Sequence, residues 1–126
     1  MLLLDTDVLI WLVRGNAKLL KAIEGLKKGE VCSISTITIA EIYKNIFPSE
    51  IQSTDELIYQ HIIYPVDDII AKQAGFYWQE YSLKLMKLTL TDCLIAATAK
   101  INNLVLVSLN TKHFPMKDIK IFNPLN

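Results

Sequence analysis

The amino-terminal segment holds an apolar run that is broken once, by two carboxylates flanking a hydroxyl (Asp5, Thr6 and Asp7). Leu2–Leu4 has no polar alternation and is only a few residues long, which predicts a strand buried on both faces. Residues 8–13 predict the start of a helix, with Asp5 or Thr6 as its capping residue. Open α/β sheets bind ligands at the edge where strands give way to helices. We therefore expect the functional side chains of the protein at this break.

Beyond this break the chain alternates short apolar segments with amphipathic ones. Further strands are predicted over residues 31–35, 62–66, 104–107 and 119–122, the second and the last of these at sheet edges. Helices are predicted over residues 17–28, 36–47, 67–81 and 93–101, and a shorter one, capped by Thr54 or Asp55, ends near residue 61 after a polar connection at 49–53. This alternation indicates an α/β fold with a parallel sheet covered on both faces.

Size and hydropathy predict one domain that does not cross a membrane. The 126 residues form a single domain over residues 1–126, without room for a second one. The hydrophobic content of 52% and the mean hydropathy of +0.30 are high, but no apolar run approaches the roughly 20 residues of a membrane-spanning helix. No basic segment precedes the first apolar run, so a secretion signal is not expected. We expect a cytoplasmic protein whose excess apolar residues lie in the buried sheet and in an oligomer interface.

The balance of charges argues against a protein that coats nucleic acid. There are 13 basic and 13 acidic residues, and the pI is near 6.7. Bulk electrostatic binding to DNA or RNA requires more positive charge than this. An enzyme that binds a polyanion through local lysines and bound cations remains compatible with the balance.

Three acidic residues that are far apart in the sequence are predicted to meet at one edge of the sheet. Asp5 ends the first strand, Glu41 lies in the first turn of the helix after the second strand, and Asp92 lies in the first turn of the helix before the fourth strand. Helix amino termini gather at the carboxyl edge of a parallel sheet, because each crossover helix runs opposite to the strands. Asn110, just beyond the fourth strand, is expected beside them.

Each acid also has an ordinary structural role open to it. Asp5 has the place of a helix cap, Thr38 and Glu41 have the spacing of a capping box, and Thr89 and Asp92 nearly have it. As a group, however, clustered carboxylates repel one another and raise each other's pKa unless a cation keeps them ionised. Oxygen ligands without His or Cys favour Mg²⁺ or Mn²⁺.

Three segments carry a resemblance to a known family: LLLDTDVLIWL, STITIAEIYKN and LTLTDCLIAATAKINNLVLVSLNTKHF. In them the chain resembles PIN-domain ribonucleases, and specifically the VapC-type toxins of toxin–antitoxin pairs. The resemblance implies a three-layer α/β/α PIN-like fold with a central, mostly parallel sheet and a Mg²⁺- or Mn²⁺-dependent endoribonuclease activity. It also implies a homodimer, an RNA substrate (tRNA, rRNA or mRNA) and inhibition by a cognate antitoxin whose tail occupies the active-site groove.

Carried over by position, the resemblance implies a catalytic site of Asp5, Glu41, Asp92 and Asn110. Asp5 and Asp92 would hold the metal ion, with Glu41 as a ligand directly or through water. The fourth place is often Asp in PIN nucleases. Asn110 removes one negative charge there, so the binding of a second metal ion stays an open question. Assisting roles are expected for their neighbours: Asp7 as a secondary group, and Thr6 and Ser108 in orienting a water molecule.

Two other functions stay open. A PIN-like module could bind RNA or a partner protein without cutting it, which Asn110 and the neutral net charge favour and the intact acids oppose. A small-molecule phosphatase resembling the haloacid dehalogenases also carries Asp-x-Asp after its first strand. Such an enzyme expects Thr or Val where this chain has Leu9, and the downstream acids fit it less well.

Overall fold

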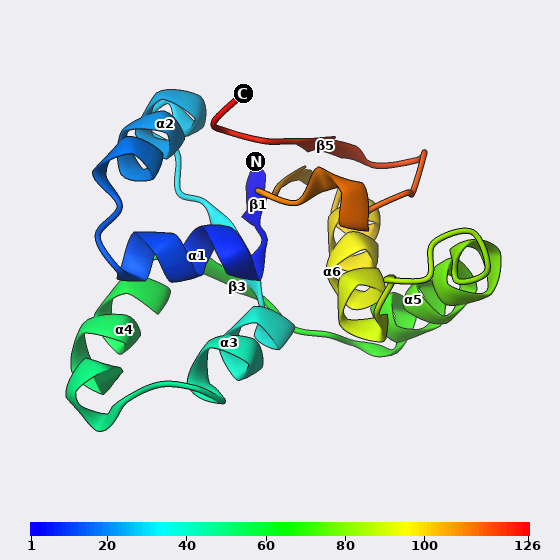
Figure 1. Ribbon diagram of the computed structural model, residues 1–126, viewed down its shortest axis with the longest axis horizontal. Coiled ribbons are helices and arrows are strands. Elements are labelled where there is room, and N and C mark those ends of the chain that lie inside the picture. Colours follow the sequence, from blue (N-terminus) through cyan, green and yellow to red (C-terminus); the bar gives the residue numbers. More distant parts are fainter.

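A five-stranded sheet forms the centre of the molecule in a computed structural model that describes residues 1–126 (Figure 1). The strands are β1 (Leu2–Leu4), β2 (Ser33–Ser35), β3 (Ile62–Tyr64), β4 (Val105–Val107) and β5 (Lys120–Phe122). Their order is β3-β2-β1-β4-β5, and every neighbouring pair is parallel. The predicted α/β class is confirmed, and so is the prediction that the third and fifth strands lie at the edges.

Six helices connect the strands and cover both faces of the sheet. They are α1 (Thr6–Val13), α2 (Ala17–Lys27), α3 (Thr36–Tyr43), α4 (Ile51–Ile58), α5 (Asp68–Tyr81) and α6 (Leu90–Ile101), with short 3-10 turns η1 (Pro48–Glu50) and η2 (Thr111–His113). Figure 1 shows α5 and α6 together on one side and α1 to α4 on the other. None of the helices combines the length and the apolar character that a membrane span needs.

Alternating side chains of the central strands build two separate cores. Leu3 and Leu106 pack into one cluster with α5 and α6, whereas Leu4 and Val107 pack into a second cluster with α1 and α2. This follows from the two-residue period of a strand, which sends successive side chains to opposite faces. Because side chains on both faces of β1 and β4 pack against helices, these two strands are apolar throughout, as expected for strands buried on both faces.

The prediction for residues 49–58 is wrong. A polar connection was expected up to a cap at Thr54 or Asp55, but η1 and α4 already form a continuous helical segment from Pro48. Pro48 fixes a helical φ at the first position, and the amide of Phe47 donates to the Glu50 carboxylate at 3.2 Å. Thr54 is therefore a fully buried residue inside α4 and not its cap. The preceding helix, α3, also ends earlier than predicted, at Tyr43.

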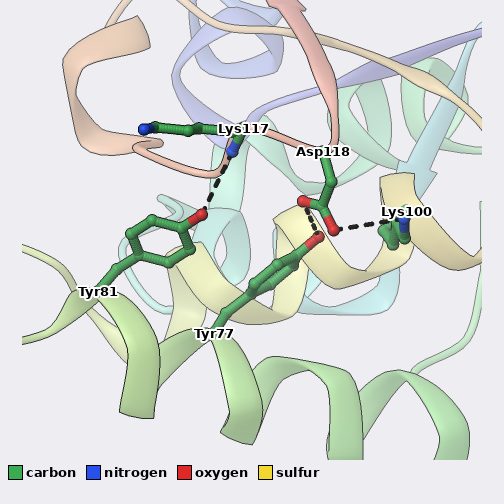
Figure 2. Close-up of polar contacts among 5 residues, drawn as sticks. All are labelled: Tyr77, Tyr81, Lys100, Lys117 and Asp118. Atoms are coloured by element: carbon green, nitrogen blue, oxygen red, sulfur yellow. Dashed lines mark hydrogen bonds and ion pairs between the residues drawn. The ribbon is translucent and has the colours of Figure 1, made fainter.

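A polar cluster ties the segment before β5 to the two helices beneath it (Figure 2). The Tyr77 hydroxyl donates to Asp118 Oδ1 at 2.8 Å, and Lys100 Nζ lies 3.3 Å from Asp118 Oδ2. The amide of Lys117 donates to the Tyr81 hydroxyl at 3.4 Å. Since Asp118 precedes β5, this cluster lies at the amino edge of the sheet, opposite the edge where the predicted site residues lie.

Candidate active site

Asp5 sits where β1 ends and α1 begins, and both of its carboxylate oxygens are held. Its amide donates to the Val107 carbonyl at 2.9 Å, which continues the pairing of β1 with β4. Oδ1 accepts from the amide of Thr6 at 2.8 Å, so Asp5 is the cap of α1, as predicted. Oδ2 accepts from the Ser108 hydroxyl at 2.8 Å. Only 8% of Asp5 is exposed, so the carboxylate is fixed in a largely dry environment.

The surroundings of Asp5 disfavour its charged form. Burial is the main cause, followed by the charge of Asp7 and more weakly that of Asp92; together they raise the pKa of Asp5 from 3.8 to about 7, against the lowering effect of the bonds from Ser108 and Thr6. The molecule has two ion pairs, Lys27 with Glu24 and Lys100 with Asp118, and neither involves a site acid. The negative charge at this edge is thus not neutralised by any side-chain ion pair.

Glu41 reaches the same edge through Thr6. The Thr6 hydroxyl donates to Glu41 Oε1 at 2.6 Å and lies 3.2 Å from the Thr38 hydroxyl. Glu41 is in the second turn of α3 and not in the first, because Ser35 caps this helix by accepting from the amide of Ile37 at 3.1 Å. The prediction of a first-turn position is wrong for this reason, and the expected capping box of Thr38 with Glu41 does not form.

Asp92 combines a structural role with a place near Asp5. It is the third residue of α6 and forms a capping box: its amide donates to the Thr89 hydroxyl at 3.1 Å, and the amide of Thr89 donates to Asp92 Oδ2 at 3.3 Å. Its charge nevertheless acts on Asp5 and contributes to the raised pKa of that residue. The capping role and the predicted position at the carboxyl edge are therefore both compatible with the structure.

Asn110 contacts Asp7, for which the sequence predicts only an assisting role. Asn110 Nδ2 donates to Asp7 Oδ2 at 2.7 Å, and the amide of Asn110 donates to the Ser108 hydroxyl at 3.0 Å. Ser108 in turn donates to Asp5, so a chain of hydrogen bonds runs from the loop after β4 to the end of β1. The pairing of Asp7 with Asn110 depends on the conformation of this loop, which sequence patterns do not predict. The Asp-Thr-Asp pattern is the only sequence signal that points to a role for Asp7.

The donor atoms at this edge suit a hard divalent cation. The groups are carboxylate, hydroxyl and amide oxygens, which Mg²⁺ and Mn²⁺ prefer. Asp7 Oδ1 is buried without a hydrogen-bond partner, so a carboxylate oxygen is available. No three His, Cys, Asp or Glu side chains lie close enough together to hold a metal ion directly. The residues therefore fit a cation that keeps several water molecules between itself and some of the acids, as Mg²⁺ commonly does.

A cavity opens beside Glu41, between α1, α3 and α4. Its volume is about 110 Å³, and its wall includes Arg14, Glu41, Asn45 and Thr54. The Thr54 hydroxyl on this wall is buried and has no partner. The cavity therefore borders one of the predicted site acids.

Three comparisons with known proteins cover nearly the whole chain. The family model described as the PIN domain matches residues 2–119. Ribonuclease VapC10 of Mycobacterium tuberculosis is 33% identical over 116 residues, which is 92% of this chain and 87% of that protein. A chain of a toxin–antitoxin complex from Klebsiella pneumoniae superimposes with a TM-score of 0.81 at 30% identity, and the match covers 98% of both chains.

A further solved structure supports the fold alone. A chain of the DNA-bound VapBC structure from Salmonella typhimurium superimposes with a TM-score of 0.83 over 98% of this chain and 97% of that one, at 22% identity. The family match, over residues 2–119, includes the segment from Asp5 to Asn110. The three-layer arrangement with a parallel sheet is thus shared with solved relatives.

Proposed function

This chain belongs to the PIN-domain family and to its VapC-type branch, and on that premise we propose that it is a Mg²⁺- or Mn²⁺-dependent endoribonuclease, the toxin of a toxin–antitoxin module. One observation carries the proposal. A buried carboxylate, Asp5, lies at the carboxyl edge of the sheet under the charges of Asp7 and Asp92, with Glu41 joined to it through Thr6. No side-chain ion pair offsets these charges.

Asp5, Asp92 and Glu41 are proposed to hold the cation. A bound divalent cation lowers the pKa of a water molecule and offsets the charge that builds up on a phosphate under attack. Thr6 and Ser108 keep the acids in place, because the Thr6 hydroxyl donates to Glu41 and the Ser108 hydroxyl donates to Asp5. In-line hydrolysis at this edge would leave a 5′-phosphate and a 3′-hydroxyl on the RNA.

The surface around α1 and α4 supports a protein partner. Large apolar side chains are exposed there: Trp11 (45%), Phe47 (67%), Ile51 (43%) and Tyr59 (72%). They come from α1, from α4 and from residues that flank α4, and exposed apolar surface is typical of a protein interface. We assign this surface to a cognate antitoxin whose tail inhibits the enzyme, and the related Klebsiella pneumoniae chain is found in a toxin–antitoxin complex. A homodimer and a cytoplasmic location, where RNA is available, belong to the same proposal.

Cleavage of RNA by the purified chain tests the activity. Labelled tRNA, rRNA and mRNA are incubated with and without Mn²⁺, and the ends of the products are mapped. We expect cleavage that needs the metal ion, leaves 5′-phosphates and is lost in Asp5→Asn. The matched control is Asp118→Asn, which makes the same change at the amino edge of the sheet, opposite the site.

The alternative, a PIN-like module that binds without cutting, rests on the neutral side chain of Asn110 and on the absence of three acids within direct metal-binding distance. That alternative predicts RNA or antitoxin binding without metal-dependent cleavage. Equal cleavage by the unchanged chain and Asp5→Asn would exclude the proposed site.

A further inference from the structure

Asp7 and Asn110 form a pair whose geometry is not explained by ordinary helix chemistry. Asp7 lies in the first turn of α1, where acidic residues are common because they stabilise the helix dipole. Its carboxylate makes no hydrogen bond with the free amides of that turn; the cap of the helix is Asp5, which accepts from the amide of Thr6. Asp7 Oδ2 accepts instead from Asn110 Nδ2, at 2.7 Å. The pair spans 103 positions of sequence and joins the ends of β1 and β4.

The second oxygen of Asp7 is buried and unpaired. Oδ1 has no hydrogen-bond partner, although burying a carboxylate oxygen without a donor or a cation costs free energy. The bond to Asn110 holds the carboxylate in this orientation, because it occupies Oδ2. A group that supplies positive charge or donor hydrogens at Oδ1 would remove the cost.

Hydrogen bonds also link Asp7 to the site of Asp5. Asn110 donates to Asp7, the amide of Asn110 donates to the Ser108 hydroxyl, and that hydroxyl donates to Asp5. The same side chain thus combines a free buried oxygen with a fixed place beside the central carboxylate. Asn110, by contrast, brings no charge and turns its amide nitrogen toward Asp7.

We propose that Asp7 is the fourth acid of the cation site, binding the cation or its water through Oδ1, and that Asn110 is the positioning residue that holds it. This inference rests on the proposed metal dependence of the same site. It explains how a neutral Asn110 is compatible with a fully charged site: the fourth negative charge is carried by the first turn of α1 instead of the loop after β4.

Calorimetric titration of the chain with Mn²⁺ alone tests the assignment without any RNA. Asp7→Asn keeps an oxygen that can accept from Asn110 but removes the charge, and we expect it to weaken Mn²⁺ binding by about 10-fold or more. Asp118→Asn makes the same change at the amino edge of the sheet, opposite the site, and should leave the affinity within about twofold. Thermal unfolding without metal checks that both variants fold.

The decisive variant exchanges the two side chains. Asp7→Asn combined with Asn110→Asp restores the charge and reverses the donor and acceptor of the pair, so Mn²⁺ affinity should return to within about threefold of the unchanged chain. Unchanged affinity in Asp7→Asn, or no recovery in the exchanged pair, would overturn the assignment. If the chain binds Mn²⁺ through Asp7 but cuts no RNA, the proposed nuclease function fails while this inference stands. If the chain cuts RNA but Asp7→Asn leaves its Mn²⁺ affinity unchanged, only this inference fails.

Discussion

The Ser108 hydroxyl donates a hydrogen bond of 2.8 Å to Asp5 Oδ2, across 103 positions of sequence. Ser108 is fully buried just beyond β4, and Asp5 lies at the end of the neighbouring strand β1. The same hydroxyl accepts from the amide of Asn110, so one side chain fixes both the central carboxylate and the loop that carries Asn110. The register of two parallel strands thereby sets the geometry of the candidate site.

Removing this hydroxyl should destabilise the fold measurably. Hydrogen bonds to charged groups contribute about 1.5–3 kcal/mol, so Ser108→Ala is expected to lower the free energy of unfolding by that order. The control is Ser33→Ala, because the equally buried Ser33 donates to a neutral carbonyl, that of Leu2, at 2.8 Å; about 0.5–1.5 kcal/mol is expected there. Urea unfolding of both variants checks the difference, and equal losses would show that the Asp5 bond is not charge-assisted.

The stability of the metal-free chain should fall as pH rises from about 4 to about 7. Burial, with the charge of Asp7, raises the pKa of Asp5 in the folded state to about 7, whereas the unfolded chain has the ordinary value of 3.8. Between these values the folded state binds more protons than the unfolded state, so raising the pH costs stability, by up to about 4 kcal/mol. In Asp5→Asn this decline should disappear. Unfolding in the presence of a chelator from pH 4 to pH 8 tests it, and parallel pH profiles of the two proteins would contradict it.

The Thr6 hydroxyl should matter for activity more than for folding. Thr6→Val keeps the shape but removes the donor to Glu41 Oε1, and we expect RNA cleavage to slow by about 10-fold or more, as is typical when the partner of a metal-site ligand is lost. Thr6→Ser keeps the donor and should cleave at nearly the unchanged rate. Initial rates on one RNA substrate compare the two, and equal rates would mean that Thr6 does not position Glu41.

Tyr77 should matter for the stability of the fold and not for RNA cleavage. Tyr77→Phe removes the bond to Asp118 at the amino edge of the sheet (Figure 2), so we expect a loss of about 1 kcal/mol in stability. RNA cleavage and Mn²⁺ affinity should be unchanged, since the candidate site lies at the opposite edge. Thermal unfolding and cleavage assays on the same preparation test this, and a reduced Mn²⁺ affinity would show that the two edges are coupled.

Local sequence patterns were sufficient for the positions of Asp5 and Asp92. Both follow from rules that act over a few residues: an apolar strand that ends in a cap, and a capping box at a helix start. Glu41 was placed one turn too early because Ser35, not Thr38, caps α3. Thr54 looked like a cap in sequence, yet it is buried inside α4, because the packing of this helix on the core overrides the local preference of Thr.

Contacts that join distant loops were beyond the reach of sequence patterns. The bond from Asn110 to Asp7 and the bond from Thr6 to Glu41 link positions whose separation carries no periodic signal. They depend on the order of the strands and on the conformation of the loop after β4. The four expected site positions nevertheless belong to strand ends and helix beginnings, which parallel topology gathers at one edge of the sheet.

The most direct test of the whole account is whether acids from separate elements share one cation. Calorimetric titration with Mn²⁺ compares the unchanged chain with Asp5→Asn, Glu41→Gln and Asp92→Asn, one variant at a time. If the site is shared, each substitution lowers the Mn²⁺ affinity by about 10-fold or more, although the three residues lie on different elements. Mn²⁺ affinity that is unchanged in all three variants would contradict the account.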